Sequence, residues 1–213
     1  MGVRAGVGLV GVVCCVVLAG CTSPVSGTPD ASAGSGGGRS SSPATSGGAP
    51  SSTGVGFEAP RVPAPIDATK YLAAPCTVLT PEQLVPFEVN PTGEPVTSGS
   101  TFEAAGPSCS WEPLDRKGDF NLLFPDKNKY GLSDYYRERK RWAYFEPIEV
   151  GGYPAAHFDV GKQDRRGLGF CGIVVGLTDT LAFSIIRQGG PGPQACDQVR
   201  DMAAAALTTM KGA

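Results

Sequence analysis

Residues 22–60 of this chain are built mainly from Ser, Gly, Pro, Ala and Thr, with very few large apolar side chains. Such a segment cannot bury enough surface to offset the entropy lost on ordering, so we expect a flexible tether over residues 21–60. Residues 61–213 have ordinary hydrophobic content. They are expected to form one globular domain of about 150 residues, which is long enough for a single hydrophobic core.

Residues 1–20 have the form of a secretory signal peptide. Arg4 supplies a positive charge, and the apolar run at 7–18 is shorter than the ~20 residues that span a bilayer. The sequence Leu18-Ala19-Gly20-Cys21 resembles a bacterial lipobox. This resemblance implies cleavage after Gly20, acylation of Cys21 and a lipid-anchored position on the extracytoplasmic face of the cell membrane. An ordinary secretory signal with an incidental Cys21 remains the alternative.

The charge balance argues against nucleic acid as a partner. The formal net charge is −2, and loss of Arg4 with the signal peptide makes it about −3. A mildly acidic chain has no positive field that would attract phosphate groups along its whole surface. We therefore expect no nucleic-acid partner.

Turn and cap residues predict several elements of the domain. Thr80, Pro81 and Gln83 have the pattern of a capped helix start, which Pro86 ends early. Runs at 109–114 and 120–124 predict a hairpin, and residues 148–160 predict a strand with a turn or bulge at Gly151-Gly152. Two buried strands are expected at 169–177 and 180–187, around Thr178-Asp179.

Two further helices are expected. Ser133 is predicted to cap a helix that runs to about Tyr144, and apolar residues at helical spacing predict a last helix from Ala195 to Met210. Because short turns join the strand runs, the sheet should be mostly antiparallel. We expect an α+β fold in which helices pack against that sheet.

Cysteine usage favours two disulfides in the domain. The four cysteines outside the N-terminal segment are Cys76, Cys109, Cys171 and Cys196, and an even number in an exported domain is typical of a disulfide-stapled fold. We predict Cys76–Cys196, which would join the two ends of the domain, and Cys109–Cys171, which would join two core strands. The alternative pairing is Cys76–Cys109 with Cys171–Cys196. No Cys-x-x-Cys spacing predicts a metal site.

Short motifs along the domain together resemble those of an actinobacterial lipoprotein family of unknown function. They lie between Ala73 and the C-terminus and comprise Pro75-Cys76, Leu79-Thr80, Leu84, Cys109-Ser110-Trp111, Gly152-Tyr153-Pro154-Ala155, Cys171 and Cys196. The resemblance implies an exported, lipid-anchored protein and a layout similar to PsbP-like α+β domains. It implies no catalytic residues.

Two patterns could carry chemistry. Gly167 to Gly172 matches G-x-G-x-x-G, but it is expected to enter a strand, so we interpret it as a glycine-rich strand start and not as a dinucleotide site. His157 and Asp159 could share one face of a strand as two metal ligands, but a zinc site needs more partners, so a structural His157 is expected. No metal, cofactor or catalytic residue is predicted.

The basic stretch Arg137, Lys140 and Arg141 is the candidate contact patch for anionic lipid, an envelope polymer or an acidic protein partner. The alternative is a solvated face of an amphipathic helix. We expect a non-enzymatic, membrane-anchored lipoprotein that binds an envelope component or a partner protein. The alternative functions are a carrier of a small apolar ligand or lipid and an envelope hydrolase.

Overall fold

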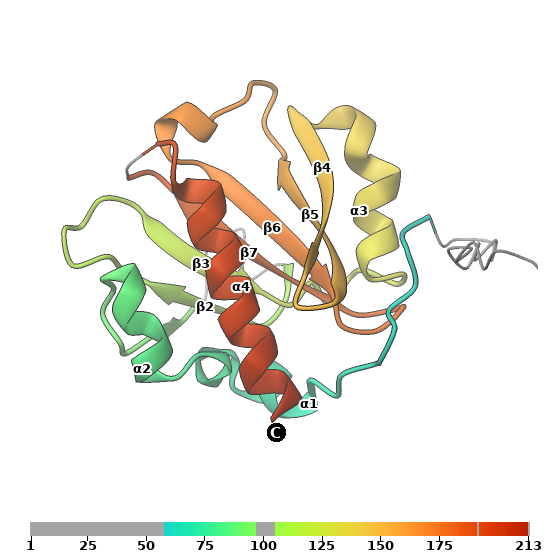
Figure 1. Ribbon diagram of the computed structural model, residues 1–213, viewed down its shortest axis with the longest axis horizontal. Coiled ribbons are helices and arrows are strands. Elements are labelled where there is room, and N and C mark those ends of the chain that lie inside the picture. The colour runs from blue at the N-terminus through green and yellow to red at the C-terminus, as the bar shows by residue number, and fades with distance from the viewer. Residues whose placement is uncertain (1–57, 97–104, 191, 213) are drawn as a thin grey trace, which may run out of the picture. The chain divides into compact units, whose positions relative to one another are not determined.

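The computed structural model describes residues 58–96, 105–190 and 192–212. In these ranges one antiparallel sheet has the strand order β1-β2-β3-β7-β6-β5-β4 (Figure 1). Its strands are β1 (Glu94–Pro95), β2 (Ser108–Trp111), β3 (Asp119–Leu123), β4 (Tyr144–Val150), β5 (Tyr153–Asp159), β6 (Cys171–Gly176) and β7 (Ala182–Gln188). The predicted α+β class with an antiparallel sheet is confirmed.

Helices lie between and after the strands. The α-helices are α1 (Thr69–Ala73), α2 (Pro81–Leu84), α3 (Leu132–Glu138) and α4 (Ala195–Lys211), and the 3-10 turns are η1 (Pro75–Val78), η2 (Val85–Phe87), η4 (Arg139–Arg141) and η5 (Arg166–Leu168). The sequence predicted α2, α4 and most of α3, but not α1, η1 or the short β1.

Tight turns join the paired strands, as the sequence predicted. Residues 148–160 are not one strand but two, because Gly151 and Gly152 turn the chain with φ angles of 56° and 85°. These left-handed angles favour glycine, which has no Cβ to clash with the backbone. The predicted pairs at 109–124 and 169–187 also form antiparallel hairpins.

Hydrophobic side chains pack on both faces of the sheet. Ile173 and Val175 face one cluster with α4, whereas Val174 faces a second cluster with Leu132 of α3. Successive residues of a strand point to opposite faces, so a fully apolar run such as this one needs a helix on each side. The predicted burial of this strand is confirmed.

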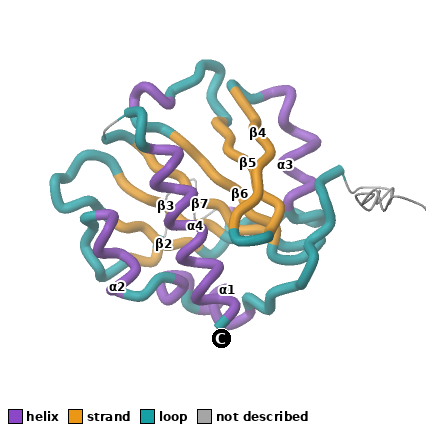
Figure 2. The backbone as a smooth tube through the Cα atoms, in the orientation of Figure 1, coloured by secondary structure: helices purple, strands orange, loops and turns teal. Residues whose placement is uncertain are grey.

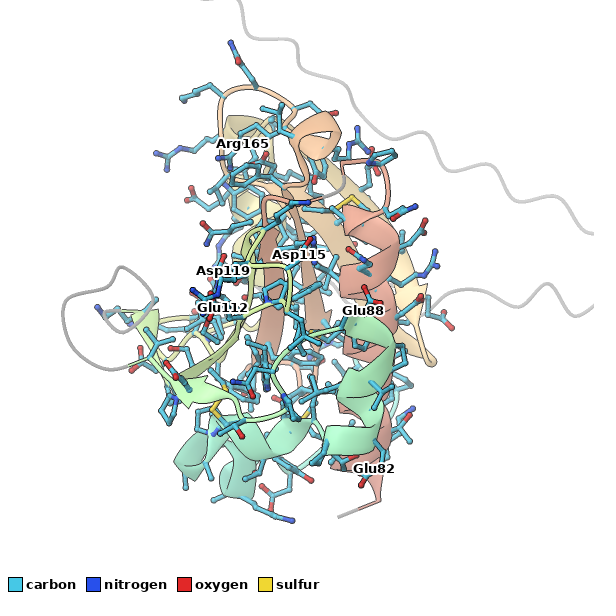
Figure 3. The ribbon with its side chains drawn as sticks, turned by 90° about the vertical axis from the view of Figure 1, so that its left-hand side faces the viewer. Glu82, Glu88, Glu112, Asp115, Asp119 and Arg165 are labelled. Atoms are coloured by element: carbon cyan, nitrogen blue, oxygen red, sulfur yellow. A yellow bond between two sulfur atoms is a disulfide. The ribbon has the colours of Figure 1, made fainter. Side chains whose placement is uncertain are left out.

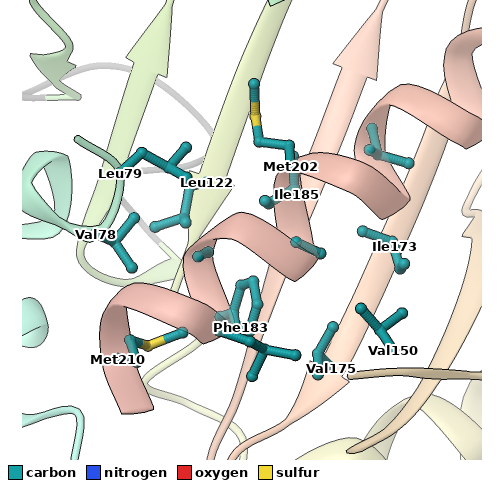
Figure 4. Close-up of a cluster of buried hydrophobic side chains, with 14 of the residues drawn as sticks. Val78, Leu79, Leu122, Val150, Ile173, Val175, Phe183, Ile185, Met202 and Met210 are labelled. Carbon is teal, nitrogen blue, oxygen red and sulfur yellow. The ribbon is translucent and has the colours of Figure 1, made fainter. Parts of the chain in front are cut away.

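The predicted apolar stripe of α4 packs across the middle of the sheet (Figure 4). Its members Ala195, Val199, Met202, Ala206 and Met210 are all buried. They contact strand residues that include Phe183 and Ile185, so the main core lies between α4 and the sheet.

The predicted start of α2 is confirmed in detail. The side-chain oxygen of Thr80 accepts the N–H of Gln83, and the Gln83 side chain accepts the N–H of Thr80. These two hydrogen bonds satisfy N–H groups that the first turn of a helix leaves unpaired. The α-helix ends at Leu84, and η2 continues the chain through Pro86.

The described chain before α1 is a loop that starts beside α3 and leads to α1 (Figure 2). Its first described residues, Glu58 and Ala59, each donate a backbone hydrogen bond of 3.0 Å to the Ser133 hydroxyl. The prediction that Ser133 caps α3 was therefore wrong. Gly131 stands at the N-cap, and Ser133 lies inside the helix, where it holds the incoming chain.

The predicted helix at 133–144 is shorter than expected. α3 ends at Glu138, η4 ends at Arg141, and Trp142 is extended. The chain leaves the helix because Tyr144 begins β4 and pairs with Asp159 of β5.

The preferred disulfide pairing was wrong and the alternative is observed. Cys76 is bonded to Cys109, and Cys171 is bonded to Cys196. β3 and β7 separate β2 from β6, so Cys109 and Cys171 lie on strands ~14 Å apart, beyond the reach of a disulfide.

Cys76 and Cys196 are kept apart by the length of α4. The segment around Cys76 lies against the C-terminal half of α4, where the Gln83 amide donates to the Ala205 carbonyl over 3.1 Å. Cys196 is in the first turn of that helix, ~14 Å from Ala205 along the axis.

Candidate functional site

A polar cavity of about 370 Å³ opens between η2, the β2–β3 turn, β7 and α4. We name it the Arg187 cavity. It is lined by Phe87, Glu88, Pro113, Leu114, Asp115, Arg187 and Gln198. These residues come from four separate parts of the chain, so the site exists only when the fold is complete.

Arg187 lines the cavity as a buried cation that is 3% exposed. Its guanidinium carbon lies 4.4 Å from the centroid of the Phe120 ring, and its Nε has no hydrogen-bond partner. Among the described residues it forms no ion pair. Burial lowers the pKa of Arg187, and the nearby charges of Asp115 and Asp119 offset this only in part.

A second buried polar atom near the cavity has no hydrogen-bond partner among the described residues. Oε1 of Gln198, on α4, is buried and accepts no hydrogen bond from any described residue. Burying polar groups without partners costs free energy, typically 1–3 kcal/mol for each one. Arg187 and Gln198 together therefore leave both a donor and an acceptor unused beside one cavity.

Backbone hydrogen bonds hold two walls of the cavity together. The N–H of Leu114 donates to the carbonyl of Glu88 over 2.8 Å, and the N–H of Asn90 donates to the carbonyl of Glu112 over 2.9 Å. Glu88 has a φ of 52° and Arg116 a φ of 56°. These are the non-glycine residues with positive φ in the described chain, and both belong to the wall segments. Such strained positions cluster at functional sites.

An apolar groove of about 400 Å³ adjoins the Arg187 cavity. It is lined by Pro81, Glu82, Leu84, Val85, Glu88, Val89, Pro91 and Leu114. Glu88 and Leu114 line both hollows, so the two lie next to each other. Val85 and Leu114 are 73% and 72% exposed, unusually high for large apolar side chains.

Acidic side chains lie along the rim of these hollows (Figure 3). Glu82 and Glu88 come from the α2 side, and Asp115 comes from the β2–β3 turn. All three are exposed, in contrast to the buried Arg187. The site thus has a cation at depth and anions at its edge.

Sequence reasoning assigned no role to Arg187, although one signal was present. Phe183, Ile185 and Arg187 alternate along β7, so a charged residue continues the apolar face of a strand. The burial of Arg187 could have been expected from that alternation. The cavity could not, because its other walls come from distant parts of the chain.

Ion pairs neutralise part of the positive charge of the predicted contact patch. Arg137 forms an ion pair with Asp134, and Arg141 forms one of 2.7 Å with Glu138. Lys140 is exposed and forms no ion pair with a described residue. The three cations stay on one short segment, but carboxylates of the same segment neutralise two of them.

His157 is 8% exposed on β5, and its Nδ1 lies 3.6 Å from Sγ of Cys171. Burial lowers the pKa of His157. Its ring, Cys171 and Cys196 come within 4.8 Å of one another, but the two sulfur atoms are bonded together in the disulfide. They are therefore not free thiolates that could bind a metal ion.

Asp159 does not join His157 in a ligand set. It accepts hydrogen bonds from Arg165 Nε over 3.0 Å and from the N–H of Gly161 over 2.8 Å. Burial raises the pKa of Asp159, but these hydrogen bonds outweigh it and leave the pKa below its ordinary value. The carboxylate is a structural anchor for the β5–β6 loop.

The glycine pattern at 167–172 begins inside η5 and ends in β6, so it does not open an α-helix. The interpretation as a strand start is confirmed. Cys21 and the proposed signal peptide and tether up to residue 57 lie outside the described residues. None of the helices in the described part of the chain combines the length and apolar character that crossing a bilayer requires.

Comparison with known proteins gives a family and no function. No curated protein and no solved structure matches the chain. The expected likeness to PsbP-like domains therefore stays a prediction. A family model described as protein of unknown function (DUF3558) matches residues 16–209. The match spans nearly the whole chain, including all of the sheet, and the protein therefore belongs to the DUF3558 family.

Proposed function

We propose that this protein is a lipid-anchored lipoprotein of the actinobacterial type, whose domain binds a component of the cell envelope without chemical conversion. The sequence pattern that ends at Cys21 supports the anchor. The Arg187 cavity supports the binding role.

One observation carries the binding proposal. Arg187 is buried beside an open cavity, forms no ion pair with a described residue, and has only the more distant charges of Asp115 and Asp119 to offset its burial. A buried charge without a counter-ion is unfavourable. A ligand that brings an anionic group into the cavity would supply the missing partner, and guanidinium groups bind planar carboxylates in a bidentate manner.

The lining of the cavity does not have the side chains of an acyl-transfer site. Its polar side chains are two carboxylates, one amide and one guanidinium. Acyl-transfer sites need a nucleophile with a neighbouring base, and the described lining offers no Ser, Cys or His for those roles.

The proposal can be tested by retention of envelope material. The full-length chain, purified in detergent and immobilised, is mixed with a wall and membrane fraction of the source cell. We expect specific retention by the wild type and its loss with Arg187→Gln. The control Arg200→Gln changes an exposed arginine on α4 and should retain the material. Equal retention by all three would contradict a role for Arg187.

A second candidate function is carriage of a small apolar ligand. The apolar groove beside Leu114 favours it. In that case Leu114→Ser should abolish uptake of a fluorescent fatty acid, whereas Arg187→Gln should leave the uptake unchanged.

A further inference from the structure

The buried and exposed charges of the site are ordered by depth, and this order restricts the ligand. Arg187 is 3% exposed, whereas Glu88 and Asp115 are exposed at the rim. A simple anion would pass two carboxylates to reach one cation. A ligand that carries an anionic group and a cationic group at different places can bind Arg187 with the first and the rim carboxylates with the second.

The two unused polar atoms suggest what enters the cavity. Nε of Arg187 is a donor that needs an acceptor, and Oε1 of Gln198 is an acceptor that needs a donor. The end of a peptide offers both within one residue. Its terminal carboxylate accepts hydrogen bonds from a guanidinium, and the preceding amide N–H can donate to an amide oxygen.

The apolar groove accounts for the remainder of such a ligand. It adjoins the cavity at Leu114 and Glu88, and it reaches Leu84 and Val85. An extended residue spans ~3.3–3.6 Å, so a few residues upstream of a carboxyl end cover both hollows. An apolar side chain would lie on Leu114 and Val85, and a basic one would reach Glu88 or Asp115.

We propose that the site binds the free carboxyl end of a short peptide that also carries a basic and an apolar side chain. This assignment rests on the proposed binding function and names the ligand class. It accounts for the unused donor, the unused acceptor, the acidic rim and the exposed apolar residues with one ligand. A purely structural role for Arg187, through its contact with Phe120, does not account for the unused acceptor, the acidic rim or the exposed apolar residues.

The test is calorimetric titration of the full-length chain in detergent with defined peptides. The probe is the tripeptide Leu-Lys-Ala with a free carboxyl end. Two comparison peptides are titrated in the same way. The first is the same tripeptide with an amidated carboxyl end, and the second has Gln in place of Lys. We expect amidation to weaken binding about tenfold or more, and loss of the amine to weaken it about fivefold.

Variants then assign each group of the peptide. Arg187→Gln should weaken binding of the free-acid peptide and remove the difference in affinity between the free-acid and amidated peptides. Glu88→Gln with Asp115→Asn should remove the difference between the Lys and Gln peptides. Lys162→Gln, a charge change in the β5–β6 loop at a residue that does not line the cavity, serves as the control and should change neither difference. The amidation result uses only the wild type, so it stands even if Arg187→Gln fails to fold.

The possible outcomes separate this inference from the proposed function. If acid and amide bind equally well, the contact between the carboxylate and Arg187 is wrong. If no peptide binds but Arg187-dependent retention of envelope material persists, the ligand class is wrong and the binding function stands. If both experiments are negative, both proposals fail.

Discussion

The guanidinium of Arg187 stacks on the Phe120 ring at 4.4 Å and has no carboxylate partner among the described residues. A cation–π contact of this kind contributes about 0.5–2 kcal/mol. That is less than the cost of removing a full charge from water, so the ring alone does not account for the burial of Arg187. The side chain costs stability at a position where an apolar residue would fit the face of β7.

We expect Arg187→Met to fold at least as stably as the wild type. Methionine keeps much of the volume and removes the buried charge, so the free energy of unfolding should stay within about 1 kcal/mol or increase. Urea unfolding followed by circular dichroism measures this. The same variant should no longer retain envelope material. A loss of several kcal/mol would show that Arg187 is needed for the fold.

A double-mutant cycle isolates the contact with the ring. Phe120→Leu should cost about 0.5–2 kcal/mol more in the wild type than in the Arg187→Met background, because only the wild type loses the cation–π contact. Equal costs in both backgrounds would mean that the guanidinium gains nothing from the ring.

The pair formed by Asp159 and Arg165 predicts a pH dependence of stability. The pKa of Asp159 is lowered in the fold, so its stabilisation is fully present above the unfolded value of about 3.9 and is lost as the pH falls through the folded value. Asp159→Asn should cost about 1–2 kcal/mol at pH 7, the lower part of the range for charged hydrogen bonds, because the Arg165 side chain is 37% exposed.

The measurement is urea unfolding of wild type and Asp159→Asn from pH 7 to pH 2.5. The difference between them should shrink below about pH 4. Asp197→Asn is the matched control, because Asp197 is 65% exposed in its ion pair with Arg200 and should show little effect at any pH. A difference that persists unchanged at pH 2.5 would argue against an ionised Asp159.

Local features of the fold were predictable, and long-range ones were not. The capping box at Thr80 and the turn at Gly151-Gly152 follow from neighbouring residues, and so does the stripe of α4. Strand order does not, because it depends on which hairpins meet in the sheet. β7 pairs with β3 across more than sixty residues, for example Ile185 with Leu122. That pairing separates Cys109 from Cys171 and creates the Arg187 cavity.

Each disulfide closes a short loop, which sets its expected contribution. The sequence separations are 33 for Cys76–Cys109 and 25 for Cys171–Cys196. The chain-entropy relation gives about 3.5–4 kcal/mol for each. Replacing both Cys171 and Cys196 by Ala should therefore lower the melting temperature strongly, and the Cys76/Cys109 double variant should do the same. Peptide mapping without reduction should recover only the two observed linkages; a Cys76–Cys196 peptide would contradict them.

The proposed anchor predicts a change of compartment. Cys21→Ser should move the protein out of the membrane fraction or leave the signal peptide attached, because the thiol that would carry the lipid is gone. Two acyl chains hold a protein firmly, whereas a single chain binds only marginally. Cell fractionation with mass spectrometry of the N-terminus measures both effects. A processed Cys21→Ser protein that remains in the membrane at the wild-type level would show that another feature anchors it.

The charge pairing on α3 and η4 predicts which residue of the contact patch matters. Glu138 neutralises Arg141, and Lys140 is the exposed cation without an ion pair among the described residues. For the Cys21→Ser chain on vesicles of phosphatidylglycerol and phosphatidylcholine, Lys140→Gln should weaken binding, and Glu138→Gln should strengthen it, each by about fivefold. Both effects should fade as salt is raised above ~0.1 M, where exposed charges are screened beyond ~10 Å. If neither substitution alters vesicle binding at low salt, this surface is only the solvated face of the helix.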